Sequence, residues 1–154
     1  MARAAAIRDR AGEIDYRALA EVRYQLRRFL VFSEREARGA GVEPQQHQLL
    51  LAIKGLPDGQ RPTISSLAER LQLRHHTVVG LVDRLVDAQL LARSRSTLDR
   101  REILLQITAR GEQLLRRLSL VHRAELERAR PALVGAMATL VGRAKSRRAR
   151  RARR

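Results

Sequence analysis

The sequence predicts a mainly α-helical fold that contains one small β-hairpin. Three observations support this prediction. Apolar residues recur at three- and four-residue spacing along most of the 154-residue chain, which is typical of amphipathic helices. Two short helical segments in the middle of the chain are separated by a turn of three to four residues. The segment that follows them has two apolar ends and a polar centre, which is the pattern of a hairpin.

The N-terminal third of the chain predicts two helices. The first, with its closing turn, covers 13–43 and is ended by the sequence GAGVEP. The second begins near Pro44, contains His47 and ends at the loop PDGQRP. The apolar positions of the first helix are Leu19, Val22, Leu26, Phe29, Leu30 and Phe32.

The middle of the chain predicts a helix-turn-helix. Thr63 is a suitable N-cap for the short helix ISSLAERL, because its hydroxyl can accept a hydrogen bond from the first helical turn. After a tight step, a second helix is expected over about 74–88, and we name it the recognition helix. Its apolar face consists of Val78, Leu81, Val82, Leu85 and Val86.

Two strands are expected after the recognition helix, at 90–95 and 102–107. The second strand is rich in branched residues, and the connection SRSTLDRR is polar. The segment 44–108 therefore predicts a winged helix-turn-helix, with its wing at about 91–107.

The C-terminal part predicts a long helix that Pro131 interrupts, followed by a shorter helix. We expect a disordered tail at 143–154, because eight like charges in twelve residues repel one another. The terminal helices, at 13–43 and 109–142, carry long apolar faces without an obvious partner in so small a body. This pattern predicts that they dimerise.

The charge of the chain favours a polyanionic partner. The net charge of the whole chain is +16. Without the tail at 143–154, which holds eight basic residues, 24 basic and 16 acidic residues remain and the net charge is still +8. Double-stranded DNA is the simplest such partner, and an anionic membrane surface is the alternative. Aromatic residues make up only 3% of the chain, which argues against base-stacking surfaces for single strands.

Several classes of protein are disfavoured by the sequence. The absence of cysteine excludes disulfides, thiolate metal sites and thiol redox sensing. No catalytic triad, phosphate loop or acidic metal cluster is evident, so we expect no enzyme, no cofactor and no metal. The N-terminus lacks a secretory signal and no apolar run could span a bilayer, which predicts a cytoplasmic protein associated with the nucleoid and not with a membrane.

From about Val42 to Gly111 the chain resembles the MarR (multiple-antibiotic-resistance regulator) family of bacterial transcription factors. The blocks that carry the resemblance are VEPQQHQLLLAI, TISSLAERLQLRHHTVVGLVDRLVDAQLLARS and the wing sequence LDRR followed by IT-x-x-G. The chain departs from the family pattern at three places. Arg74 stands at the usual Ser/Thr-like start of the recognition helix, Gln89 replaces a frequent glycine, and Val79-Gly80 replaces common polar side chains.

The resemblance implies a homodimer whose terminal helices intertwine. Its recognition helices would enter adjacent major grooves of a pseudo-palindromic operator, and its wings would reach the flanking minor grooves. It also implies a repressor that is released by a small effector, such as an aromatic carboxylate, bound between the dimerisation and DNA-binding parts. His47 would then line the effector cleft; a buried structural histidine or a pH-sensing one are the alternatives.

The first turn of the recognition helix holds the side chains expected to read DNA. Arg74 suits a guanine or a phosphate, and the two histidines can donate to phosphates or base acceptors. Gly80 would let the backbone approach the groove, while Arg84 reaches a phosphate or pairs with Asp83 or Asp87. Adjacent helical residues point about 100° apart, so a zinc site on the two histidines is not expected. The candidate residues are Arg74, His75, His76, Thr77, Gly80 and Arg84.

The wing gathers four arginines around one acid. The narrow, negative minor groove favours an inserted arginine, and Arg101 is the candidate by its place in Asp-x-Arg. Asp99 is expected to hold a guanidinium in position, Arg95 and Arg100 to lie against phosphates, and Arg93 to be structural. The alternative is a solvated turn whose surface ion pair contributes little.

Two functions of different classes follow. The first is a dimeric, sequence-specific DNA-binding regulator. The second is an adaptor or nucleic-acid-coating protein that binds polyanions through its basic surface and tail without sequence preference.

Overall fold

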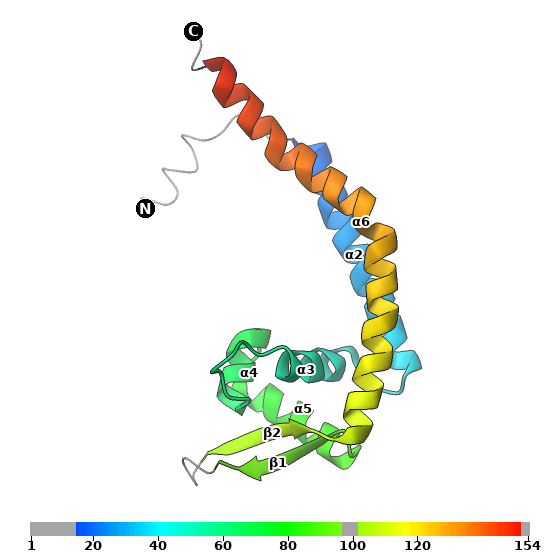
Figure 1. The fold of residues 1–154 in the computed structure, drawn as a ribbon, viewed down its shortest axis with the longest axis vertical. Coiled ribbons are helices and arrows are strands. Elements are labelled where there is room, and N and C mark those ends of the chain that lie inside the picture. The colour runs from blue at the N-terminus through cyan, green and yellow to red at the C-terminus, as the bar shows by residue number, and fades with distance from the viewer. Residues whose placement is uncertain (1–14, 97–101, 152–154) are drawn as a thin grey trace. The chain divides into compact units, whose positions relative to one another are not determined.

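The structure is a computed structural model that describes residues 15–96 and 102–151, with side chains as far as residue 141. Its elements follow the order expected from the sequence (Figure 1), and the mainly helical fold with one hairpin is confirmed. They are α2 (Tyr16–Gly39), α3 (Pro44–Lys54), α4 (Ile64–Leu71), α5 (His75–Asp87), β1 (Leu91–Arg95), β2 (Ile103–Ile107) and α6 (Ala109–Arg151).

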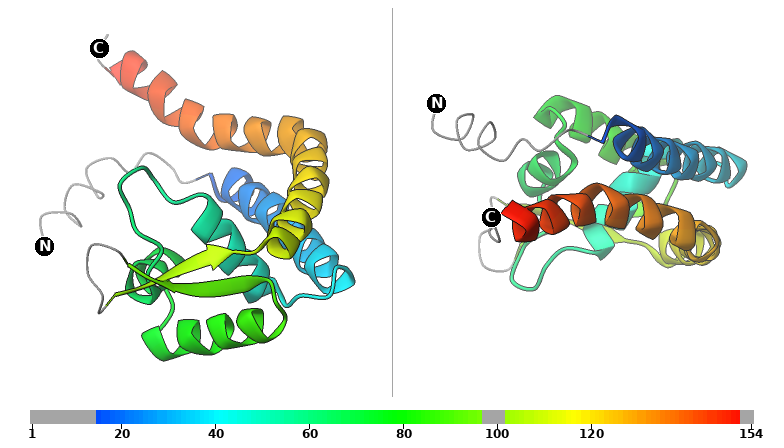
Figure 2. Two further views of the ribbon diagram at one scale, coloured as in Figure 1. Left: turned by 60° about the horizontal axis from the view of Figure 1, so that its bottom comes forward. Right: turned by 90° about the horizontal axis from the view of Figure 1, so that it is seen from above.

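The chain divides into two units. One consists of Phe32–Arg123 and holds the helix-turn-helix and the hairpin; the other consists of Met1–Val31 and Ala124–Arg154. Within the first unit, α5 packs against α4 and β1, and β2 packs against α3 (Figure 2). The side chains buried most completely in its core are Leu49, Leu50, Leu67, Val78, Leu81, Val82, Leu85, Leu91 and Leu105.

The helix-turn-helix begins at the N-cap that the sequence predicts. The hydroxyl of Thr63 accepts a hydrogen bond from the Ser66 N–H at 3.2 Å. Gln72 ends α4 in the left-handed region, at φ 54°, and the chain then turns into α5. Arg74 occupies the N-cap position of α5 without a side-chain hydrogen bond to the helix, as its guanidinium chemistry requires.

The two ends of the hairpin are joined by hydrogen bonds between Thr108 and the residues Gln89 and Leu90. Its strands are antiparallel, with Leu91 opposite Ile107 and Arg95 opposite Ile103. The Thr108 N–H donates to the Leu90 carbonyl at 3.2 Å, and the Thr108 hydroxyl donates to the Gln89 carbonyl at 2.8 Å. The end of α5 and the start of α6 are thereby joined across the base of the hairpin.

Helix α6 differs from the expectation in two respects. It runs unbroken from Ala109 to Arg151, so the prediction that Pro131 interrupts it is wrong. A proline inside a helix removes one backbone hydrogen bond, a local loss that the many turns on either side can offset. The helix also extends through residues 143–151, where we expected disorder, because alanine and arginine are strong helix formers whose propensity opposes the charge repulsion.

In the second unit, many apolar side chains of α2 and α6 are exposed. The α2 residues there run up to Val31, and the α6 residues begin at Ala124. Both segments are helical, and neither buries most of its large apolar side chains within the unit. The exposed ones are Tyr16, Leu19, Tyr24, Leu26, Leu30, Val31, Leu126, Val134, Met137 and Val141.

Two histidines lie in contact inside the first unit. His47 of α3 is buried, and its ring centroid is 4.8 Å from that of His122 of α6. His122 is buried as well, because it follows Leu115 and Leu118 on the buried side of α6. Its Nδ1 lies 2.5 Å from the Leu118 carbonyl oxygen and its Nε2 lies 2.7 Å from the Ser33 hydroxyl. Since a carbonyl only accepts, Nδ1 carries the proton and donates.

Burial, together with the charge of the neighbouring His122, lowers the pKa of His47 from 6.5 to about 4. The folded chain therefore keeps His47 neutral at pH values where the unfolded chain protonates it. Of the alternatives for His47, its burial is observed; an effector-lining or pH-sensing role stays a prediction.

A methyl group on Gly111 should destabilise the junction between the hairpin and α6. A Cβ there would lie 2.2 Å from the Leu90 carbonyl oxygen and 2.7 Å from Cγ2 of Ile107. We predict that Gly111→Ala lowers the free energy of unfolding by about 1–3 kcal/mol in urea titrations at fixed protein concentration. The control is Gly135→Ala in the same helix, where a Cβ meets no atom within 4 Å and should stabilise by roughly 0.5–1 kcal/mol. Equal stability of the two variants would contradict this packing.

Acid should destabilise the protein through His47. Between pH 6.5 and about 4 the unfolded chain binds a proton at His47 that the folded chain does not, so the free energy of unfolding falls as the pH falls. The loss across this window is up to about 3 kcal/mol. Urea titrations at several pH values should show a smaller pH dependence in His47→Gln than in the wild type, whereas His75→Gln, at an exposed position, should leave it unchanged. Identical pH slopes for wild type and His47→Gln would refute the assignment.

Candidate nucleic-acid interface

The start of α5 presents polar side chains to solvent because its opposite face is buried. Val78, Leu81, Val82 and Leu85 are spaced so that all four enter the core. The remaining positions of the first turn therefore point outward. Arg74, His75 and His76 are exposed, and Thr77 is half-buried.

One turn further along α5, a guanidinium lies beside a glycine. A Cβ added to Gly80 would lie 3.7 Å from Nη1 of Arg84, so the Arg84 side chain turns back over Gly80. In the described segments of the chain, Arg84 pairs with neither Asp83 nor Asp87, which were the alternatives to a phosphate contact. Asp83 pairs instead with Arg93 on β1. The exposed Arg84 guanidinium is thus available to an external anion.

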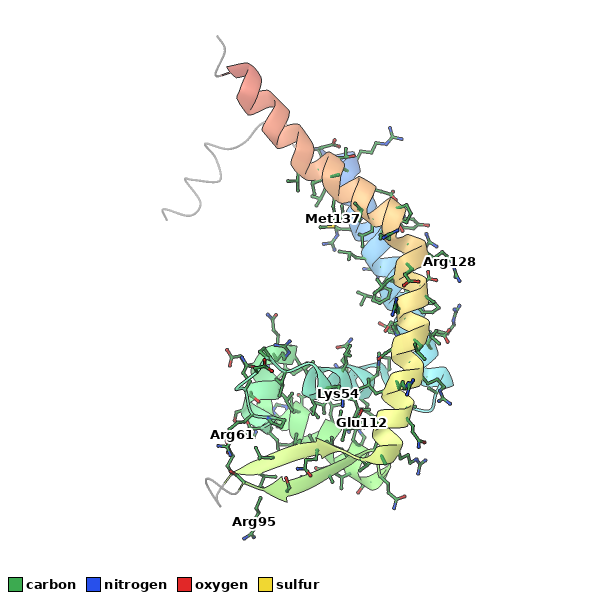
Figure 3. All side chains as sticks on the ribbon, viewed as in Figure 1. Lys54, Arg61, Arg95, Glu112, Arg128 and Met137 are labelled. Carbon is green, nitrogen blue, oxygen red and sulfur yellow. The ribbon has the colours of Figure 1, made fainter. Side chains whose placement is uncertain are left out.

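The Asp83–Arg93 pair fastens the hairpin to the recognition helix. Arg93 donates from its guanidinium to the Asp83 carboxylate, and its side chain is 35% exposed. Arg93 is one of the wing residues predicted to bind DNA, with a structural role as its expected part, and that role stays a prediction. Arg95, two residues on, is exposed at the end of β1 and points away from the hairpin (Figure 3). Asp99, Arg100 and Arg101 lie outside the described residues.

A second attachment of the hairpin was not anticipated. Arg61, in the loop before α4, forms an ion pair with Glu102 and donates a hydrogen bond to Ser96. Ser96 lies 35 positions and Glu102 lies 41 positions from Arg61 along the sequence, so no local sequence pattern indicates these contacts. The prolines and the glycine of PDGQRP mark a loop in the sequence, but nothing local distinguishes Arg61 within it.

The described segments hold no group of three or more His, Cys, Asp or Glu side chains that could bind a metal ion. Among the helices of those segments, none combines the length and the apolar character that crossing a bilayer would require. The chemistry of the exposed face is therefore that of arginine and histidine donors around α5 and the hairpin. These groups suit phosphates and the acceptors on base edges.

The fold of the chain is similar to that of known proteins. Residues 40–102 match the family model described as the MarR family. Similar solved structures include AbsC, a MarR family transcriptional regulator from Streptomyces coelicolor, at 22% identity over 74% of each chain and a TM-score of 0.60. An S. aureus MepR mutant bound to an oligodeoxyribonucleotide is 19% identical over 83% of this chain and 99% of that one, with a TM-score of 0.61.

CouR from Rhodococcus jostii RHA1, bound to p-coumaroyl-CoA, is 23% identical over 65% of this chain and 68% of that one, with a TM-score of 0.57. No curated protein sequence is similar enough to this chain to count as a relative. The MarR family consists of transcription regulators and not of enzymes. The family-model match over residues 40–102 and the fold shared with these solved structures confirm the resemblance that the helix and wing motifs indicated.

Proposed function

We propose that the protein is a homodimer that binds a pseudo-palindromic operator in double-stranded DNA and represses transcription until a small effector releases it. The observation that carries the proposal is the exposed first turn of α5, with the hairpin fastened beside it by the Asp83–Arg93 pair. A helix presented in this way fits the major groove of B-DNA, with its N-terminal residues nearest the base edges.

Each exposed side chain would have a distinct task on the DNA. Arg74, His75 and His76 would reach base edges or phosphates from the first turn of α5. Arg84, lying over Gly80, would meet the phosphate backbone one turn further on. Arg95 and Arg100 would lie against phosphates beside the wing, and Arg101 would enter the minor groove, held by Asp99. The S. aureus MepR structure with a bound oligodeoxyribonucleotide supports this use of the fold.

Dimerisation would cover the apolar faces left open on the terminal helices. Leu26 and Leu30 of α2 are each about half exposed, and Met137 and Val141 of α6 are exposed to a similar degree. Together, such side chains on two helices expose more apolar surface than a monomeric protein usually leaves in contact with water. The interface would consist of these faces in both copies, and the two recognition helices would then contact one half-site each.

One solved structure of the same fold supports the proposal of a small effector. CouR from Rhodococcus jostii RHA1 has been solved with p-coumaroyl-CoA, which shows that this fold can hold an aromatic acyl compound. An aromatic carboxylate is accordingly the first class of compound to test for release of DNA. His47 would line its cleft only if that cleft reaches the buried pair with His122.

The alternative is a nucleic-acid-coating protein without sequence preference. The net charge of +16 and the eight basic groups in the last twelve residues favour it, because counterion release gives affinity for any duplex. The outward-facing polar turn of α5 favours the regulator, since a coating protein has no need for side chains aimed at base edges.

DNA-binding measurements should separate the two functions. We predict that the protein prefers the DNA upstream of its own gene over random duplex of equal length by roughly 10³-fold or more. Arg101→Ala should weaken operator binding by about 1–3 kcal/mol at fixed salt and leave random-duplex binding nearly unchanged. Fluorescence anisotropy at two salt concentrations checks both statements. Equal affinity for the two duplexes would favour the coating protein.

The dimer is tested by mass in solution. Sedimentation equilibrium should give twice the 17.5 kDa mass of one chain. The double change Leu26→Glu with Leu30→Glu places two carboxylates on the apolar face of α2 and should dissociate the dimer, because burying an unpaired charge costs several kcal/mol. Arg23→Glu on an exposed position of the same helix is the control and should leave the mass unchanged. A wild-type protein of single-chain mass would exclude the dimer.

A further inference from the structure

We propose that Arg61 and Glu102 are positioning residues for the wing: together with Ser96 they fix the direction in which the hairpin leaves the helix-turn-helix. The inference deepens the proposed function and rests on it, because a wing has a direction to keep only if it binds DNA. Neither residue needs to touch DNA in this role.

On the hairpin side, one guanidinium holds both strands. Ser96 follows β1 and Glu102 precedes β2, and the Ser96 N–H donates to the Glu102 carbonyl at 2.9 Å. Arg61 contacts the Ser96 hydroxyl and the Glu102 carboxylate with the same nitrogen, Nη2. Ser96 is buried, and the side chains of Arg61 and Glu102 are 37% and 28% exposed. Partial shielding from water makes such a pair stronger than a fully exposed one.

On the helix side, the backbone of Arg61 is fixed to the start of α4. The Arg61 carbonyl accepts hydrogen bonds from the Thr63 N–H at 2.8 Å and from the Ser66 hydroxyl at 2.6 Å. The next residue, Pro62, accepts a bond from the Leu105 N–H of β2 at 2.9 Å. The Arg61 side chain therefore extends from a rigid base, and Figure 3 shows it beside the outer end of the hairpin.

Side-chain attachments at two different points on the hairpin set its direction more tightly than one attachment would. The Asp83–Arg93 pair fastens the middle of β1 to α5, and Arg61 fastens the outer ends of both strands to the loop before α4. Removing the outer attachment would leave the outer end of the hairpin held by the backbone bond from Leu105 to Pro62 and by the buried side chains of the strands, so its direction would be set less tightly. The wing arginines beyond Ser96 would then meet the minor groove in a range of orientations.

The charge of Glu102 makes the inference testable against simple electrostatics. A carboxylate close to DNA repels phosphate, so its neutralisation alone should tighten binding. If Glu102 instead holds Arg61 and the wing in place, the same neutralisation should weaken binding. The two explanations predict opposite signs for one substitution.

The experiment compares Glu102→Gln with Glu112→Gln by anisotropy on the duplex from upstream of the gene. Glu112 is the matched control: it pairs with Lys54 at 2.7 Å, and Figure 3 shows that pair at the opposite end of the hairpin from Arg61. We expect Glu102→Gln to weaken operator binding severalfold. The effect should not exceed that of losing the arginine inserted into the groove, which is about 5- to 150-fold. Glu112→Gln should not weaken it.

Two further variants establish that the effect passes through the wing. Arg61→Gln should weaken binding about as much as Glu102→Gln, and the double variant no more than either one. In an Arg101→Ala background, Glu102→Gln should have no further effect. Binding by Glu102→Gln that is equal to or tighter than wild type would overturn the inference, as would full additivity with Arg101→Ala.

Hydrogen exchange measured on the protein without DNA tests the positioning role of Arg61 and Glu102 independently of the proposed DNA-binding function. Both single variants should accelerate exchange at the Ser96 and Leu105 amides and leave the core amides of α5 unchanged. Unchanged exchange at these two amides would overturn the inference even if DNA binding is specific. A wild-type protein without operator preference would instead refute the proposed function, whatever the exchange shows.

Discussion

The burial of one face of α5 is the constraint on which the rest of this molecule depends. Four apolar side chains at positions 78, 81, 82 and 85 enter a core that α3, α4, the hairpin and the start of α6 complete. Once they are buried, the rotation of the helix about its own axis is set, and so is the set of side chains that faces water. The exposure of Arg74, His75 and His76 is thus a consequence of core packing and not of any contact that these residues make.

The charges around this face are arranged unevenly, and the arrangement bears on function. The carboxylates of Asp83 and Glu102 are each paired with an arginine of the same chain, so their repulsion of a polyanion is reduced. Arg84 of α5 and Arg95 of β1 are both exposed. In the proposed interface, these two acidic residues would hold arginines in place, and the exposed arginines would attract the phosphates.

Features with a local sequence signal were predicted well. The Thr63 cap, the apolar face of α5 and the strands of the hairpin all follow from spacings of a few residues, and the structure contains them. The errors arose where two effects of similar size compete: proline and charge repulsion against helix propensity in α6. The burial of His122 and the Arg61–Glu102 pair depend on contacts between distant segments, for which one sequence gives no signal.

The junction at Leu90 has a consequence for how this protein can vary. Because Thr108 bonds back to Leu90 and Gln89, the chain leaves the helical body and returns to it at one point. The number of residues in the connection between Ser96 and Glu102 can therefore change while the strands and their contacts with the helices stay in place. The entropy of closing a loop grows only with the logarithm of its length, so such changes cost little stability.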